Sequence, residues 1–97
     1  MKWDEIVWTK HDILPSKCAR ISCGRYTISL IEEINCLGVY ELAVFHQGNL
    51  CQIAGIHPMT DDWGDDVLRF QTAEQCVAHI TKIHLITGKE PENANAS

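Results

Sequence analysis

The chain has 97 residues, of which 45% are hydrophobic and 22% charged, and its formal net charge is −5. This length and composition predict one folded domain with a small core and exclude a disordered chain. We expect a single domain at 1–87, followed by a flexible polar tail at 88–97.

Residues 6–9 near the N-terminus are rich in β-branched types and predict a short strand, with a helical turn as the alternative. In a strand, Trp3 and Trp8 would lie on opposite faces because their spacing is odd. Further on, Arg20–Cys23 and the alternating residues 26–31 predict a hairpin that turns at Gly24-Arg25.

A second hairpin is predicted between residues 40–46 and 50–54. If Gly48-Asn49 form a two-residue type II′ loop, His46 faces Cys51 and Val44 faces Ile53. In the strand at 40–46, Phe45 alternates with Leu42 and Val44, so an uncovered sheet face would expose it as a candidate interface.

The strongest signal is a helix at about 73–87. Thr72-Ala-Glu-Gln75 matches a capping box, apolar residues recur at helical spacing behind it, and Gly88 suits the left-handed position after the last turn. A short strand at Val67–Phe70 directly precedes this helix. We therefore predict an α+β fold in which an antiparallel sheet of four to five strands is covered on one face by the C-terminal helix.

No segment has the pattern of an export signal or a membrane span. The first fifteen residues include Lys2 and Asp4, and the longest run without Asp, Glu, Lys or Arg, 42–60, contains His46 and Pro58. The five cysteines, an odd number, favour free thiols in a reducing compartment. We expect a soluble cytoplasmic protein.

Charge is unevenly distributed along the chain. Residues 1–26 hold five basic and three acidic side chains, whereas residues 27–75 hold one basic and eight acidic ones. Nucleic-acid-binding domains normally need a basic surface, so direct binding to DNA or RNA is not expected. The same charge favours a basic protein partner.

The most distinctive segment is the acidic stretch 61–66, in which Trp63 stands among four aspartates. We interpret it as a recognition loop, with the indole as an anchor and the carboxylates pairing with a cationic partner. A solvated turn and a calcium loop are the alternatives, although the ligand spacing of an EF-hand is missing. The predicted partner-binding residues are Asp61, Asp62, Trp63, Asp65 and Asp66, with Glu32 and Glu33 as outlying support.

Metal and thiol chemistry is the alternative class of function. Cys76 and His79 share a helix face, and His46 and Cys51 would meet across the predicted hairpin. However, a buried cysteine usually behaves as a small hydrophobic residue, and no known catalytic motif occurs. We therefore expect no enzyme activity, no catalytic residues, no metal and no cofactor.

The order of parts resembles that of small accessory proteins of phages and prophages. These parts are Tyr40-Glu-Leu-Ala-Val-Phe, Gly48, the acidic loop, and Phe70-x-Thr72-Ala-Glu-Gln75 opening the last helix. The resemblance covers about residues 20–87 and includes anti-CRISPR proteins and other anti-defence inhibitors, but it assigns a role to no residue.

The resemblance implies a small acidic inhibitor in the cytoplasm of a bacterial host cell. Such a protein would occupy the basic, nucleic-acid-binding surface of a nuclease or a CRISPR-Cas effector component. The alternatives are an immunity protein that neutralises a nuclease toxin, a small zinc- or thiol-dependent protein, and a homodimer formed through an uncovered sheet face or edge.

Overall fold

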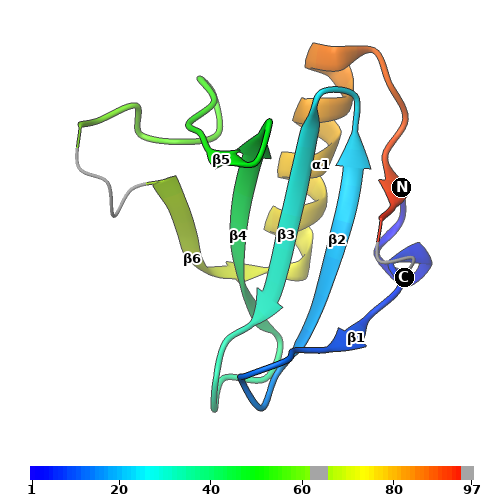
Figure 1. Cartoon of the computed structure of the whole chain (residues 1–97), viewed down its shortest axis with the longest axis vertical. Helices are drawn as coiled ribbons and strands as arrows, with labels where there is room; N and C mark the ends of the chain where they lie inside the picture. The colour runs from blue at the N-terminus through cyan, green and yellow to red at the C-terminus, as the bar shows by residue number, and fades with distance from the viewer. Residues whose placement is uncertain (62–65, 95–97) are drawn as a thin grey trace.

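Antiparallel strands form one sheet, and a single α-helix packs on one of its faces, in a computed structural model that describes residues 1–61 and 66–94 (Figure 1). The elements are η1 (Trp3–Glu5), β1 (Thr9–Lys10), β2 (Lys17–Cys23), β3 (Tyr26–Glu32), β4 (Val39–His46), β5 (Asn49–Leu50), β6 (Val67–Thr72), α1 (Ala73–Thr87) and β7 (Glu92–Asn93). The strand order is β1-β2-β3-β4-β5, with β6 paired to β4 and β7 paired to β2. The predicted α+β class is confirmed.

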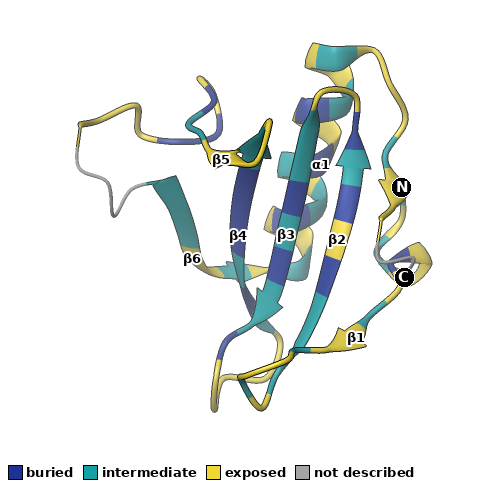
Figure 2. Ribbon diagram, viewed as in Figure 1, coloured by how far each residue is buried: buried dark blue, intermediate teal, exposed yellow. Residues whose placement is uncertain are grey.

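The core lies between α1 and the sheet face that it covers (Figure 2). Alternate residues of the central strands point to this face, as the period of two predicts. The fully buried side chains are Ile21 and Cys23 of β2, Ile28 and Leu30 of β3, Leu42 and Val44 of β4, and Cys76, Ile80 and Ile83 of α1. The opposite face of the sheet has no helix over it in the described part of the chain.

Helix α1 begins and ends where the sequence predicts. The Thr72 hydroxyl accepts a hydrogen bond from the Gln75 N–H at 3.1 Å, and the Gln75 side chain accepts one from the Thr72 N–H at 2.8 Å. Gly88 ends the helix with φ 68°, a left-handed conformation that glycine adopts without steric cost. Neither α1 nor any other described helix has the length and apolar character needed to cross a membrane.

The second hairpin has a different register from the one predicted. His46 pairs with Asn49 and Phe45 pairs with Leu50, so the two loop residues are Gln47 and Gly48. Both have positive φ, 53° and 81°, which is typical of a type I′ turn. The predicted type II′ loop was wrong because Gln47, a residue that usually avoids positive φ, takes the first loop position.

The same shift changes the expected side-chain partners. Cys51 lies beside Val44, to whose carbonyl its N–H donates at 2.9 Å, and not opposite His46. His46 instead pairs with Tyr26 of β3, with 5.7 Å between the ring centroids. The proposed pairing of His46 with Cys51 is therefore wrong.

The N-terminal segment forms the 3₁₀ turn η1 and the short strand β1 instead of a strand over residues 6–9. This turn brings the two indoles together, so the prediction of opposite faces was wrong. Trp3 and Trp8 lie 5.3 Å apart between centroids, and both contact the ring of Tyr40. The ammonium of Lys17 lies 4.7 Å from the centroid of Trp8.

Part of the segment predicted as a flexible polar tail, 88–97, is paired with the sheet. β7 pairs with the edge of β2, and the Ala94 N–H donates to the carbonyl of Arg20 at 2.8 Å. The Asn93 side chain accepts from the Val7 N–H and donates to the Glu5 carbonyl, each at 2.9 Å. Backbone pairing with β2 and the side-chain bonds of Asn93 together hold this segment in place.

Replacing Thr72 by alanine should lower the free energy of unfolding by about 1 kcal/mol, because the Gln75 N–H loses its capping acceptor. Urea denaturation followed by circular dichroism measures this change. The matched control is Thr81→Ala on the exposed side of the same helix, which we expect to change stability by less than about 0.5 kcal/mol. Equal effects of the two substitutions would contradict a capping role for Thr72.

Candidate functional site

The acidic stretch 61–66 is only partly described. Asp62, Trp63 and Asp65 lie outside the described residues, so their predicted role is neither supported nor opposed. Asp61 is exposed, whereas Asp66 is half-buried and accepts a hydrogen bond from the Gln52 side chain at 2.7 Å. At least one of the predicted carboxylates is therefore already used in a local contact.

Glu33 is held inside the fold and does not present a free carboxylate. It is 8% exposed and receives two hydrogen bonds from Arg69, at 3.0 Å from Nε and at 2.7 Å from Nη2. These bonds are the main reason why the pKa of Glu33 lies below its ordinary value of 4.5. Glu32 is half-buried, and its carboxylate lies 3.4 Å from the Gly38 N–H.

A β-bulge in β6 turns two consecutive side chains outward. Leu68 pairs with Leu42 and Gln71 pairs with Tyr40, so Arg69 and Phe70 both fall opposite one residue of β4. Phe70 has φ 56° and is 59% exposed. A left-handed conformation in a bulky residue costs on the order of 1–3 kcal/mol, and such strain is concentrated at functional sites.

The bulge determines which residue of β6 faces α1. With regular alternation, Phe70 would point to the same face as Leu68, toward the helix. Instead Gln71 takes that orientation, and its side-chain oxygen lies 3.0 Å from Nε2 of His79 on α1. The extra residue therefore places the phenyl ring in solvent and gives the inward position to an amide.

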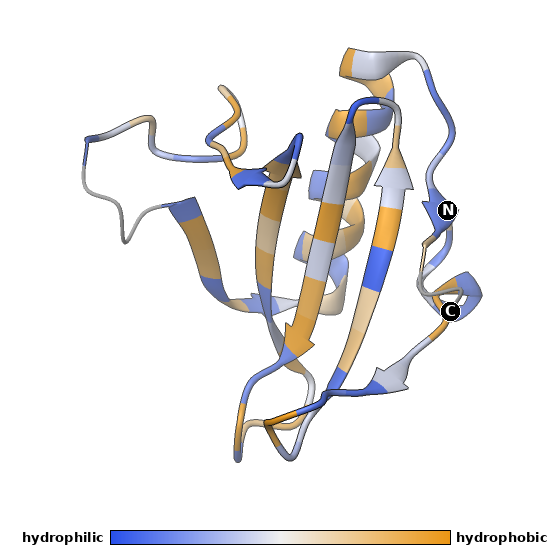
Figure 3. Cartoon of the chain, viewed as in Figure 1, coloured by the Kyte–Doolittle hydropathy of each residue, from blue (hydrophilic) through white to orange (hydrophobic). Residues whose placement is uncertain are grey.

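Phe70 borders a hollow of about 410 Å³ on the uncovered side of the sheet, which we call the Phe70 hollow. Ile34 at its rim is 44% exposed, and the Arg69 guanidinium lies 5.1 Å from the centre of the Phe70 ring. Figure 3 shows hydrophobic residues in the loops at the end of the sheet where the hollow lies. Its walls include Leu14, Ile31, Glu32, Ile34, Glu41 and Phe70.

No pattern in the sequence indicated a role for Phe70 or Ile34. The short run 67–70 predicted a strand whose side chains alternate regularly between the two sheet faces. Nothing in its composition indicates a bulge. The other predicted surface, around Phe45, does lie on the uncovered face, where this half-buried ring borders a separate hollow of about 500 Å³.

Two histidines, the buried His57 and the half-buried His79, lie near the contact between α1 and the segment 53–57. Nδ1 of His57 accepts a hydrogen bond from the Ile53 N–H at 2.8 Å, so the neutral ring carries its proton on Nε2. Two ring nitrogens, Nε2 of His57 and Nδ1 of His79, are buried and have no hydrogen-bond partner among the described residues. Lys82, one turn beyond His79, donates to the Gly55 carbonyl at 2.8 Å.

This arrangement does not favour a metal ion. A ligating imidazole needs a free electron pair, and the bond from Ile53 leaves the proton of His57 on the nitrogen that has no partner. Cys76 is fully buried, and burial raises the pKa of its thiol to about 12. Residues 1–61 and 66–94 contain no group of three or more His, Cys, Asp or Glu side chains that could hold a metal.

Comparison of the chain with protein-family models, with curated proteins and with solved structures found no match. The charge of the chain and the geometry of the uncovered sheet face are therefore the features from which we infer a function.

Replacing Glu33 by glutamine should destabilise the protein at neutral pH, because the charge-assisted bonds from Arg69 weaken. Since the pKa of Glu33 is lowered in the folded state, its stabilising contribution is present above pH 4.5 and is lost as the pH falls below that value. Chemical denaturation of both proteins at about pH 7 and about pH 3 should show the difference shrinking in acid. Glu90→Gln at an exposed position is the control; a pH-independent difference for Glu33→Gln would contradict the ion pair.

The ring resonances of His57 and His79 should titrate below 6.5 in an NMR experiment, because burial lowers both pKa values. As the pH falls below 6.5, the unfolded chain takes up these protons first, so the free energy of unfolding decreases. A midpoint at or above 6.5 for both rings would show that they are solvated.

Proposed function

We propose that this protein is a small non-catalytic inhibitor that binds a basic, nucleic-acid-binding surface of a host protein complex, in the manner of anti-CRISPR proteins. The observation that carries this proposal is the state of Arg69, the only basic residue of the acidic region 27–75. Its guanidinium is held by Glu33 at 2.7 Å and lies 3.7 Å from Glu41. The one Lys or Arg side chain of this region is therefore paired with carboxylates of the same chain, although it is itself exposed.

An acidic surface is suited to competition with nucleic acid. Proteins that hold DNA or RNA concentrate lysine and arginine where they contact phosphates. Carboxylates on this chain would be attracted to the same groups, which speeds association and excludes the nucleic acid from its site. The proposal places the protein in the cytoplasm, where such complexes act.

The experiment is a panel of purified RNA-guided effector complexes and nuclease toxins, each mixed with this protein and labelled DNA. We expect at least one member to lose DNA binding or cleavage, and we expect the inhibition to weaken as salt is raised, because salt screens charge pairs. Replacing Asp62 and Asp65 by lysine should weaken the inhibition at least about tenfold, since opposite charges now repel.

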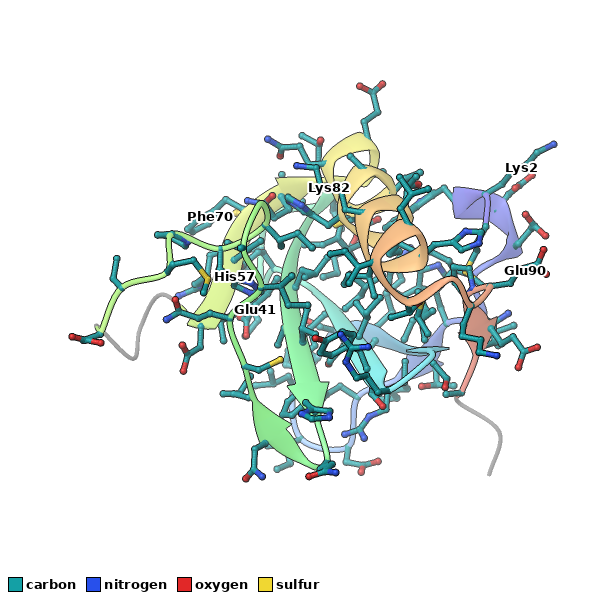
Figure 4. The ribbon with its side chains drawn as sticks, turned by 90° about the horizontal axis from the view of Figure 1, so that it is seen from above. Lys2, Glu41, His57, Phe70, Lys82 and Glu90 are labelled. Carbon is teal, nitrogen blue, oxygen red and sulfur yellow. The ribbon has the colours of Figure 1, made fainter. Side chains whose placement is uncertain are left out.

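The control is the double variant Glu90→Lys with Glu92→Lys, which changes the net charge equally. In Figure 4, Glu90 lies on the other side of the molecule from Phe70 and Glu41. Equal losses from the two double variants would indicate a general charge effect and contradict a specific acidic surface. Inhibition of no panel member would contradict the proposed function itself.

A further inference from the structure

The backbone conformation of β6 exposes the Phe70 side chain, although regular strand alternation would direct it toward the core. The bulge opposite Glu41 and the positive φ of 56° both act to keep the ring outside the core. Bulges beside binding sites commonly re-aim a side chain in this way. Exposing this aromatic ring to solvent therefore costs the fold some local stability.

The Phe70 hollow combines an apolar wall with acidic side chains. Leu14, Ile34 and Phe70 supply apolar surface, and the carboxylates of Glu32 and Glu41 stand beside them. The cation in the wall, Arg69, is exposed, but its guanidinium is paired with Glu33, which is buried beneath it, and lies 3.7 Å from Glu41. The lining therefore holds three carboxylates, those of Glu32, Glu33 and Glu41, against one cation. A ligand that enters the hollow therefore meets hydrophobic contacts together with negative charge.

We propose that the Phe70 hollow takes an apolar side chain of the basic partner, flanked in that partner by lysine or arginine. This inference rests on the proposed function and names the surface that recognises the partner. The apolar side chain packs against Phe70 and Ile34, and the flanking cations face Glu32 and Glu41. Protein interfaces typically place aromatic anchors at their centre and polar residues in the rim around it.

The probe is a short labelled peptide, Arg-Arg-Trp-Leu-Arg-Arg, titrated into isotope-labelled protein. We expect chemical-shift changes concentrated at Ile34, Glu41 and Phe70. Two comparison peptides separate the contributions: Arg-Arg-Ser-Ser-Arg-Arg keeps the charge without the apolar side chains, and Glu-Glu-Trp-Leu-Glu-Glu keeps the apolar side chains with opposite charge. Both should bind at least about tenfold more weakly than the first peptide.

The decisive variant is Phe70→Asn, because asparagine tolerates positive φ and the fold is retained. We expect it to weaken binding of the basic apolar peptide at least about tenfold. The matched control is Leu85→Asn on α1, where another exposed apolar side chain is removed. Glu41→Gln should weaken binding less and reduce its dependence on salt.

Three results would overturn the inference. They are equal binding by wild type and Phe70→Asn, shifts located away from the hollow, and concentration-dependent shifts at the hollow without peptide, which would identify a second copy of this chain as its occupant. If Phe70→Asn still inhibits a panel complex that the Asp62 and Asp65 double variant does not, the proposed function stands and this inference alone fails.

Discussion

The apolar contact between α1 and one face of the sheet determines how the other surfaces are used. Ile80 and Ile83 fill the space over the central strands, so residues of those strands that alternate with the core are left on the other face. Burial of this kind is the dominant stabilising contribution in a small domain. Because the described helix covers one face only, side chains on the other face, such as Ile31 and Phe45, stay half-buried.

Local patterns predicted the elements whose structure is determined by nearby residues. The capping box at Thr72 and the alternation of residues 26–31 depend on neighbours along the chain, and both were recognised correctly. The register of the second hairpin depended on which two residues form its loop. Gln47 was not expected at a positive φ, so the register was predicted wrongly and His46 was given the wrong partner.

The candidate surface was harder to predict because it depends on long-range pairing. Glu33 reads in sequence as one more acidic surface residue, and only the fold shows that Arg69, 36 positions away, encloses it. The bulge at Phe70 likewise could not be predicted from the sequence, since it arises from how β6 is paired with β4. The sequence did indicate the excess of acidic over basic side chains in residues 27–75. This excess is a property of composition and does not depend on how the strands are paired.

The contacts of Asn93 with Val7 and Glu5 join segments that are 86 and 88 positions apart. Closing so long a loop costs conformational entropy before any contact forms, so these bonds are added to a sheet that already exists. From this we expect an order of assembly, in which β7 docks last and separates first. Until β7 docks, the middle of the outer edge of β2 would be a template for another extended chain, and we expect the newly made protein to be most prone to associate with its neighbours at that stage.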